Sequence, residues 1–156
     1  MRRITLLVFV ALAVLLTYKQ TPDYIYKEVK KDIVRKGYEF PYLWYEDIIF
    51  STKIKTIGRS VYGMNPSMGA YASNITILIN PIEWKKMNTT QRKLLVLHEI
   101  IHSIGGEKKF HCLDRSCIMS SGYIGKWKDK NYEEVLEHTM QHHDLFKQDR
   151  SIVFRF

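Results

Sequence analysis

The order of its segments predicts an α+β fold for this chain. Helical periodicity occurs in three separate stretches, a strand-like alternation lies between the first two, and residues 38–83 are rich in Tyr, Phe, Ile and Thr. With 156 residues, 46% hydrophobic and 26% charged, the chain has the size and composition of one globular domain. Disordered, collagen-like and coiled-coil architectures are therefore excluded.

The first 20 residues differ from the rest. Arg2 and Arg3 precede an apolar run over residues 4–16, and polar residues follow from Thr17. This pattern is typical of a secretory leader, but no clear small-residue cleavage pattern follows the run. We therefore expect residues 1–20 to be a signal peptide or an N-terminal membrane anchor. Residues 21–156 would then form an exported domain that is secreted, periplasmic or anchored to a membrane facing outside the cytoplasm.

Basic residues outnumber acidic ones. The chain has 24 Lys and Arg against 16 Asp and Glu, a formal net charge of +8. Residues 1–20 hold three of these basic residues and no acidic one, so the exported domain would carry 21 against 16, a net charge of +5. Because an export signal argues against a nucleic-acid role, we expect no nucleic-acid partner.

Helix signals appear first at Thr21, with Pro22 at the first helical position and Asp23 in the first turn. We expect this helix to end at Gly37. Its apolar positions recur at helical spacing: Ile25, Val29, Ile33 and Val34.

Strands are expected in the middle of the chain. Two short ones are predicted around Asp47–Thr52 and Lys53–Ile57. A clearer one covers Asn74–Asn80, where isoleucines alternate with other residues until Pro81 ends the strand.

A second helix is predicted from Asn88, which forms a capping-box pattern with Gln91, and its end is expected at Gly105-Gly106. Its buried stripe comprises Leu94, Leu97, Ile101 and Ile104. Residues 107–130 are expected to form a loop. A third helix is expected over Tyr132–Phe146, with apolar positions at Val135, Leu136, Met140 and Leu145.

His98, Glu99 and His102 form an HExxH pattern within the second helix. Residues four apart share one helix face, so both imidazoles can bind one ion. Zinc suits this pattern, because it commonly takes three protein ligands and acidifies a bound water, from which Glu99 can accept a proton. The alternative is two histidines on a half-buried helix face with a solvated glutamate between them.

Gly105 and the segment from His111 to Met119 extend this pattern. His111-Cys112, four residues, Cys117, one residue and Met119 follow the helix. With HExxH and Gly105, they resemble the metzincin metallopeptidases (HExxHxxGxxH and a methionine turn), and the second block is similar to archaemetzincin-like and matrixin-like members. The resemblance implies that His98, His102 and His111 bind one catalytic zinc ion, that Glu99 is the general base and that Met119 lies in the turn.

The same resemblance implies a small metzincin-like domain, with a twisted mixed sheet, an active-site helix and a C-terminal helix. Asn74–Asn80 would be the edge strand, able to pair with an extended substrate. The family pattern would place its third ligand at Lys108, so the assignment to His111 implies an insertion within residues 106–110.

Other metal ligands stay open. In an exported protein, Cys112 and Cys117 are expected to form a disulfide. Because two thiolates alone cannot complete a zinc site, we expect no second zinc ion. Glu133 or Glu134 could replace His111, as in the thermolysin-like class. His138 and His142 are also four apart, but a solvated helix face is the simpler interpretation.

The predicted function is a zinc-dependent endopeptidase that cleaves a protein or peptide substrate. The alternatives are a non-catalytic zinc-binding module of the cell envelope on a peptidase fold, or a thermolysin-like peptidase with a downstream glutamate ligand. A DNA-linked peptidase would use the positive charge, but the leader opposes it.

Overall fold

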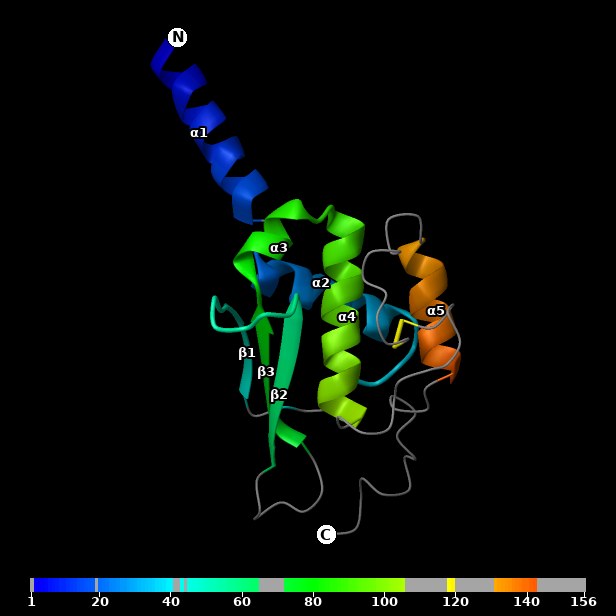
Figure 1. Cartoon of the computed structure of the whole chain (residues 1–156). Helices are drawn as coiled ribbons and strands as arrows, with labels where there is room; N and C mark the ends of the chain where they lie inside the picture. Colours follow the sequence, from blue (N-terminus) through cyan, green and yellow to red (C-terminus); the bar gives the residue numbers. More distant parts are fainter. Residues whose placement is uncertain are drawn as a thin grey trace.

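The computed structural model describes residues 2–18, 20–40, 43, 45–64, 72–105, 118–119 and 131–142. The elements run in the order α1 (Arg2–Tyr18), α2 (Pro22–Arg35), β1 (Tyr45–Phe50), β2 (Gly58–Met64), β3 (Ala72–Ile79), α3 (Pro81–Lys86), α4 (Thr89–Gly105) and α5 (Tyr132–His142). A small sheet packs against α2 and α4, and α5 lies on the far side of α4 from the sheet (Figure 1). The α+β class is therefore confirmed.

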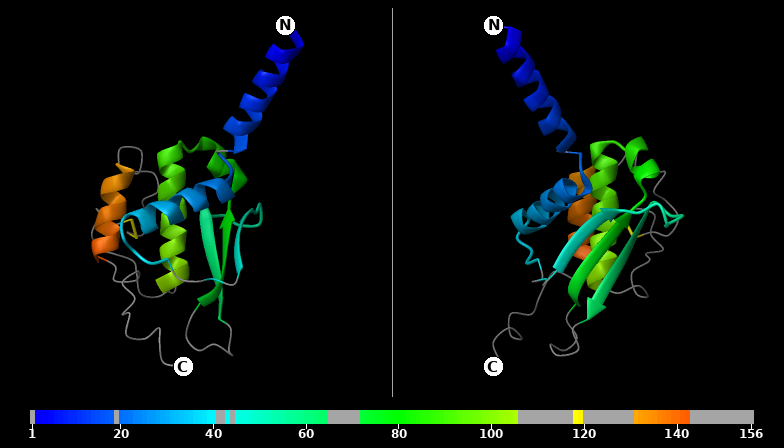
Figure 2. Two further views of the ribbon diagram at one scale, coloured as in Figure 1. Left: turned by 180° about the vertical axis from the view of Figure 1, so that it is seen from behind. Right: turned by 90° about the vertical axis from the view of Figure 1, so that its left-hand side faces the viewer.

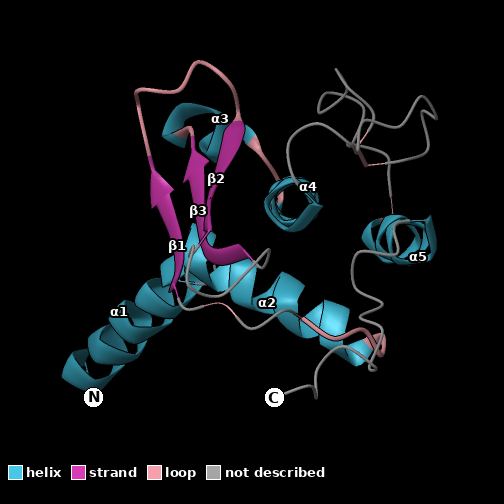
Figure 3. Ribbon diagram, turned by 90° about the horizontal axis from the view of Figure 1, so that it is seen from below, coloured by secondary structure: helices cyan, strands magenta, loops and turns pink. Residues whose placement is uncertain are grey.

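The sheet is mixed and three-stranded, with the order β1-β3-β2. β1 runs parallel to β3, from Tyr45 opposite Asn74 to Phe50 opposite Ile79. β2 runs antiparallel to β3, starting with Gly58 opposite Ile79. Viewed from below, β2 is the strand nearest α4 (Figure 3).

This strand order corrects one expectation: Asn74–Asn80 belongs to the central strand and is not an edge. The alternation of Ile75, Ile77 and Ile79 correctly indicates one buried face, since all three are fully buried. Alternation reports which face of a strand is covered, but it carries no information on whether both backbone edges are paired. β2 is the edge strand beside α4.

The predicted strand over Lys53–Ile57 is also wrong. Residues 52–57 form turns and bends, and β2 begins only at Gly58. The chain must reverse here, because β2 is antiparallel to β3 whereas β1 is parallel to it. The Asn80 backbone N–H donates to the Ile57 carbonyl at 2.9 Å, and this bond closes the reversal against the end of β3.

Local capping signals place the helix starts. The Thr21 side chain accepts a hydrogen bond from the Tyr24 N–H at 3.3 Å and caps α2 as predicted. The chain leaves this helix through Gly37, whose φ of +86° favours glycine. Pro81 does more than end β3. It opens the short helix α3, which Asn80 caps and which the sequence analysis did not anticipate.

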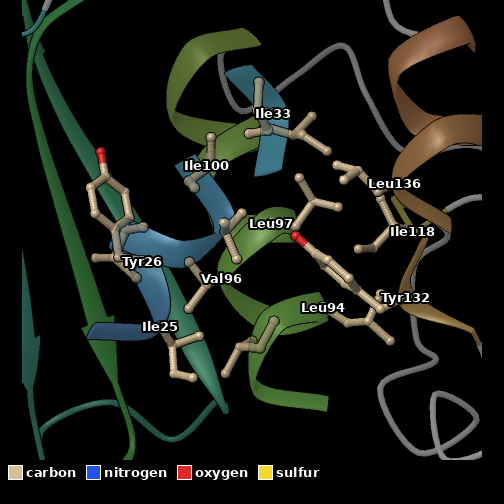
Figure 4. Close-up of a cluster of buried hydrophobic side chains, with 14 of the residues drawn as sticks. Ile25, Tyr26, Ile33, Leu94, Val96, Leu97, Ile100, Ile118, Tyr132 and Leu136 are labelled. Carbon is tan, nitrogen blue, oxygen red and sulfur yellow. The ribbon is translucent and has the colours of Figure 1, made fainter. Parts of the chain in front are cut away.

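The hydrophobic core lies between the sheet and the helices (Figure 4). α4 is buried around most of its circumference, because α2 and the sheet cover one side and α5 covers the other. Its fully buried residues are Leu94, Leu95, Val96, Leu97, Ile100 and Ile101. The side chains of this helix are therefore carried by a well-packed element.

α1 projects away from the domain as one continuous helix (Figure 2). Its large apolar side chains are more than half exposed: Leu6, Leu7, Val8, Phe9, Val10, Leu12, Val14 and Leu15. None of the described helices combines the length and apolar character that crossing a bilayer requires. At the junction, the Trp84 indole N–H donates to the Gln20 carbonyl at 3.0 Å, and Arg92 donates to the Gln20 side-chain oxygen at 2.7 Å.

Candidate metal centre

α4 begins with the predicted capping box. The Gln91 N–H donates to the Asn88 side-chain oxygen at 2.9 Å, and the Asn88 N–H donates to the Gln91 side-chain oxygen at 2.9 Å. From this start the helix runs to Gly105, so His98, Glu99 and His102 all lie in its second half. His102 is in the last turn, where the partial negative charge of the helix C-terminus favours a cation.

The two histidines converge. The Nε2 atoms of His98 and His102 are 3.1 Å apart, and the rings meet edge to face with their centroids 4.6 Å apart. Two nitrogen ligands bound to one zinc ion at about 2.0–2.1 Å in tetrahedral geometry lie about 3.3 Å from each other. The pair is therefore spaced as two ligands of one ion would be.

A backbone carbonyl fixes the protonation of His98. Its Nδ1 lies 3.0 Å from the Ile118 carbonyl oxygen, an acceptor, so Nδ1 carries the proton. In the neutral ring, Nε2 then presents its lone pair toward His102. At 3.1 Å, a hydrogen bond between the two nitrogens then requires the proton on His102 Nε2. A carbonyl that orients a histidine in this way is the usual support of a metal ligand.

Ile118 and Met119 form part of a turn and are both buried. Through the Ile118 carbonyl, this turn touches the His98 ring. Met119, which the resemblance assigns to a methionine turn, is the next residue of this turn. Its role stays a prediction.

Glu99 points away from solvent. Only 4% of the residue is exposed, whereas His98 and His102 are half-buried. Its carboxylate lies against the start of β2, because a Cβ atom built on Gly58 would be 2.8 Å from Glu99 Oε1. The helix around it is reinforced by Ser103, whose hydroxyl donates to the Glu99 carbonyl at 2.8 Å. The Glu99 carboxylate is thus buried where α4 packs against the start of β2.

The predicted third ligand, His111, lies outside the described residues. The same is true of Cys112 and Cys117, so the disulfide stays a prediction. Within the described part of the chain, no three His, Cys, Asp or Glu side chains gather closely enough to hold a metal ion. This part contains His98, Glu99 and His102 but leaves out residues 106–117.

The alternative glutamate ligands are described, and they are engaged elsewhere. Glu133 forms ion pairs with Arg35 at 3.3 Å and Lys36 at 3.6 Å. The Glu134 side chain accepts a hydrogen bond from Asn131 at 3.2 Å. The structure therefore does not bring Glu133 or Glu134 to the histidine pair. On the same helix, His138 is half-buried, and the side chain of His142 lies outside the described part.

Two contributors escaped sequence reasoning. The Ile118 carbonyl is a backbone atom, so no residue type could reveal it. Gly58 could be recognised only as a turn glycine, because its closeness to Glu99 depends on how β2 packs against α4.

Comparisons of the chain with protein-family models, with curated proteins and with solved structures gave no match.

Proposed function

We propose that this chain is an exported zinc-dependent endopeptidase with a metzincin-like domain in residues 21–156. The observation that carries the proposal is the 3.1 Å approach of the His98 and His102 Nε2 atoms, on a helix that also buries Glu99. Two histidines that converge on one helix face, next to a buried carboxylate in the sequence, are typical of a zinc site of the HExxH type.

His98 and His102 would hold one zinc ion, with His111 as the third protein ligand. When bound, zinc supplies a Lewis acid and lowers the pKa of water toward neutrality. Glu99 accepts the proton of the attacking water and delivers it to the departing amine nitrogen. The Ile118 carbonyl holds His98 in the tautomer whose Nε2 can bind the metal.

The edge that would bind an extended substrate is β2, in place of the Asn74–Asn80 strand. β2 starts at Gly58, beside Glu99, and it is the strand nearest α4. A peptide added to this edge would pass the carboxylate and the histidines. We therefore assign substrate pairing to β2.

Export is part of the proposal. α1 presents large apolar side chains on all sides, and an apolar helix of this kind is normally removed or placed in lipid. Residues 1–20 would therefore act as a signal peptide or as a membrane anchor.

The direct test is Glu99→Gln, with Glu133→Gln and Glu134→Gln as matched controls. We expect Glu99→Gln to keep its zinc and to cleave unfolded casein about 10²–10⁴-fold more slowly, because it cannot accept the proton. Both controls should retain parental cleavage and zinc. Full cleavage by Glu99→Gln would overturn the proposal, and loss of zinc in either control would transfer the third ligand to α5.

A second candidate is a non-catalytic zinc-binding module, favoured by Lys108 at the place where the family pattern has its third ligand. This module would bind zinc, but the parent chain would cleave no unfolded protein.

A further inference from the structure

Gly58 opens β2 where the sheet edge meets α4. A Cβ atom at this position would lie 2.8 Å from Glu99 Oε1, 3.2 Å from Glu99 Cδ and 3.1 Å from Leu95 Cδ1. The backbone conformation does not explain the glycine, because Gly58 is outside the positive-φ region that Gly37 occupies. The Glu99 carboxylate instead occupies the space that a side chain at position 58 would need.

We propose that Gly58 is a positioning residue for Glu99: the absence of a side chain at the start of β2 leaves the space that the Glu99 carboxylate occupies. The inference rests on the proposed function, since it assigns a role to Glu99. It adds that the edge strand sets the place of the general base.

The β2 backbone and the Leu95 side chain, which surround the Glu99 carboxylate, are held in place by their own contacts. Gly58 pairs with Ile79 of the central strand, and its carbonyl accepts a hydrogen bond from the Thr56 hydroxyl at 3.1 Å. The preceding residue, Ile57, is bonded to the Asn80 N–H at 2.9 Å. On the other side, Leu95 is fully buried. A methyl group at Gly58 would therefore displace the Glu99 carboxylate more readily than the strand.

Displacement of a reacting group by about 1 Å can cost about 10²-fold in rate. We expect Gly58→Ala to lower kcat by about 10- to 100-fold. KM should change little, because the backbone edge of β2 is unaltered. The Gly58→Ala variant should also still bind zinc in the absence of substrate, because the added methyl group is directed at the Glu99 carboxylate.

The test is a double-mutant cycle on the full chain, read first by urea unfolding without metal. Gly58→Ala should lower the unfolding midpoint in the parent, and the loss should shrink by more than half when Glu99→Ala removes the carboxylate. Gly37→Ala is the control, because its strain comes from positive φ with nothing within 4 Å, so its loss should be the same in both backgrounds.

The second measurement is kcat in the Glu99→Asp background, where the shorter side chain leaves room for a methyl group. There, Gly58→Ala should change kcat by less than about threefold, against the 10- to 100-fold expected in the parent. Equal losses of unfolding midpoint in both backgrounds would overturn the proposal whatever the activity. A different result is that the effect of Gly58→Ala on unfolding depends on Glu99 as expected, while the parent binds zinc and cleaves no substrate. That result would overturn the proposed function and leave Gly58 a packing residue only.

Discussion

The two halves of α4 differ in what their polar side chains do. From Asn88 to Leu97, each polar contact joins α4 to another element or completes its cap. From His98 to Gly105, the helix carries a histidine pair and a buried carboxylate, and Ile100 and Ile101 of this half are fully buried. Both halves have similar packing, so packing alone does not explain the second. Under the proposed function, the first half would stabilise the fold and the second half would hold the metal ion and the general base.

The first half is a structural junction. Arg92 donates to the Trp84 carbonyl at 3.2 Å and to Gln20 at 2.7 Å, and its guanidinium lies 5.2 Å from the Trp84 ring centre. Lys93 donates to Asp32 of α2 at 2.8 Å. These bonds tie α4 to α2, to α3 and to the segment between α1 and α2.

In the second half, the contacts converge on one point. The Nε2 atoms of His98 and His102 face each other, and the other ring nitrogen of His98, Nδ1, lies within hydrogen-bond distance of the Ile118 carbonyl. Under the proposed function, this pair would hold the metal ion.

The largest expected effect is on metal binding. His98→Ala and His102→Ala should each weaken zinc binding by more than about 100-fold, because each removes a ligand, whereas changes to supporting groups cost about 10- to 100-fold. Competition with a chromophoric chelator measures the affinity. The matched control is His138→Ala on α5, which should bind zinc as the parent does. A zinc affinity equal to that of the parent in His98→Ala would contradict the metal-binding role of the second half of α4.

The second effect belongs to the first half. Arg92→Met should lower the free energy of unfolding by about 1–3 kcal/mol, because it leaves the Gln20 side-chain oxygen without its donor and removes one of the two N–H groups that donate to the Trp84 carbonyl. Urea unfolding measures this change. Zinc affinity should stay at the parental value. A parallel loss of zinc would show that the two halves are not separable.

Alkaline pH provides a third test, at tyrosines that pack on either side of the core. Burial is the main cause that raises the pKa of Tyr26 and Tyr132 above the usual range, and nearby Glu46 and Asp32 respectively add to it. Above pH about 10, the unfolded chain would lose protons that the folded chain retains, so stability should fall as pH rises. Each tyrosine contributes up to about 1.4 kcal/mol per pH unit there.

Urea unfolding between pH 8 and 11 measures that slope. Tyr26→Phe and Tyr132→Phe should each make it shallower. An unchanged slope in both variants would show that neither hydroxyl carries the effect.

The smallest effect concerns the helix start. Asn88→Ala should lower the free energy of unfolding by about 1 kcal/mol, because it removes the acceptor of the Gln91 N–H. Asn88→Asp, which keeps an acceptor, is the control. Thermal unfolding followed by circular dichroism measures both. If Asn88→Ala lowered the free energy of unfolding as much as Arg92→Met does, the helix cap would contribute as much stability as the Arg92 contacts, against this expectation.

The features that could be predicted from the sequence are those set by residues close together in the chain. Thr21 and the Asn88–Gln91 pair were recognisable as caps because their partners lie within four residues. The histidine pair was recognisable for the same reason. By contrast, the central place of β3 and the start of β2 at Gly58 depend on which strands pair, and this is decided by residues far apart in the chain.

The candidate site divides in the same way. The sequence predicted that Glu99 follows His98 on the second helix, but its burial against Gly58 depends on the packing of β2 on α4. The Ile118 carbonyl meets His98 across 20 residues, so only the folded chain brings them together.

The most direct test of the central claim is the zinc content per full chain, measured for the parent and for His111→Ala. The account predicts one zinc ion in the parent and a marked loss in the variant, because His111 would complete the pair of His98 and His102. One zinc ion in both would contradict the assignment of His111 and favour another third ligand. No zinc in either would contradict the metal centre itself and return His98 and His102 to ordinary positions on a helix.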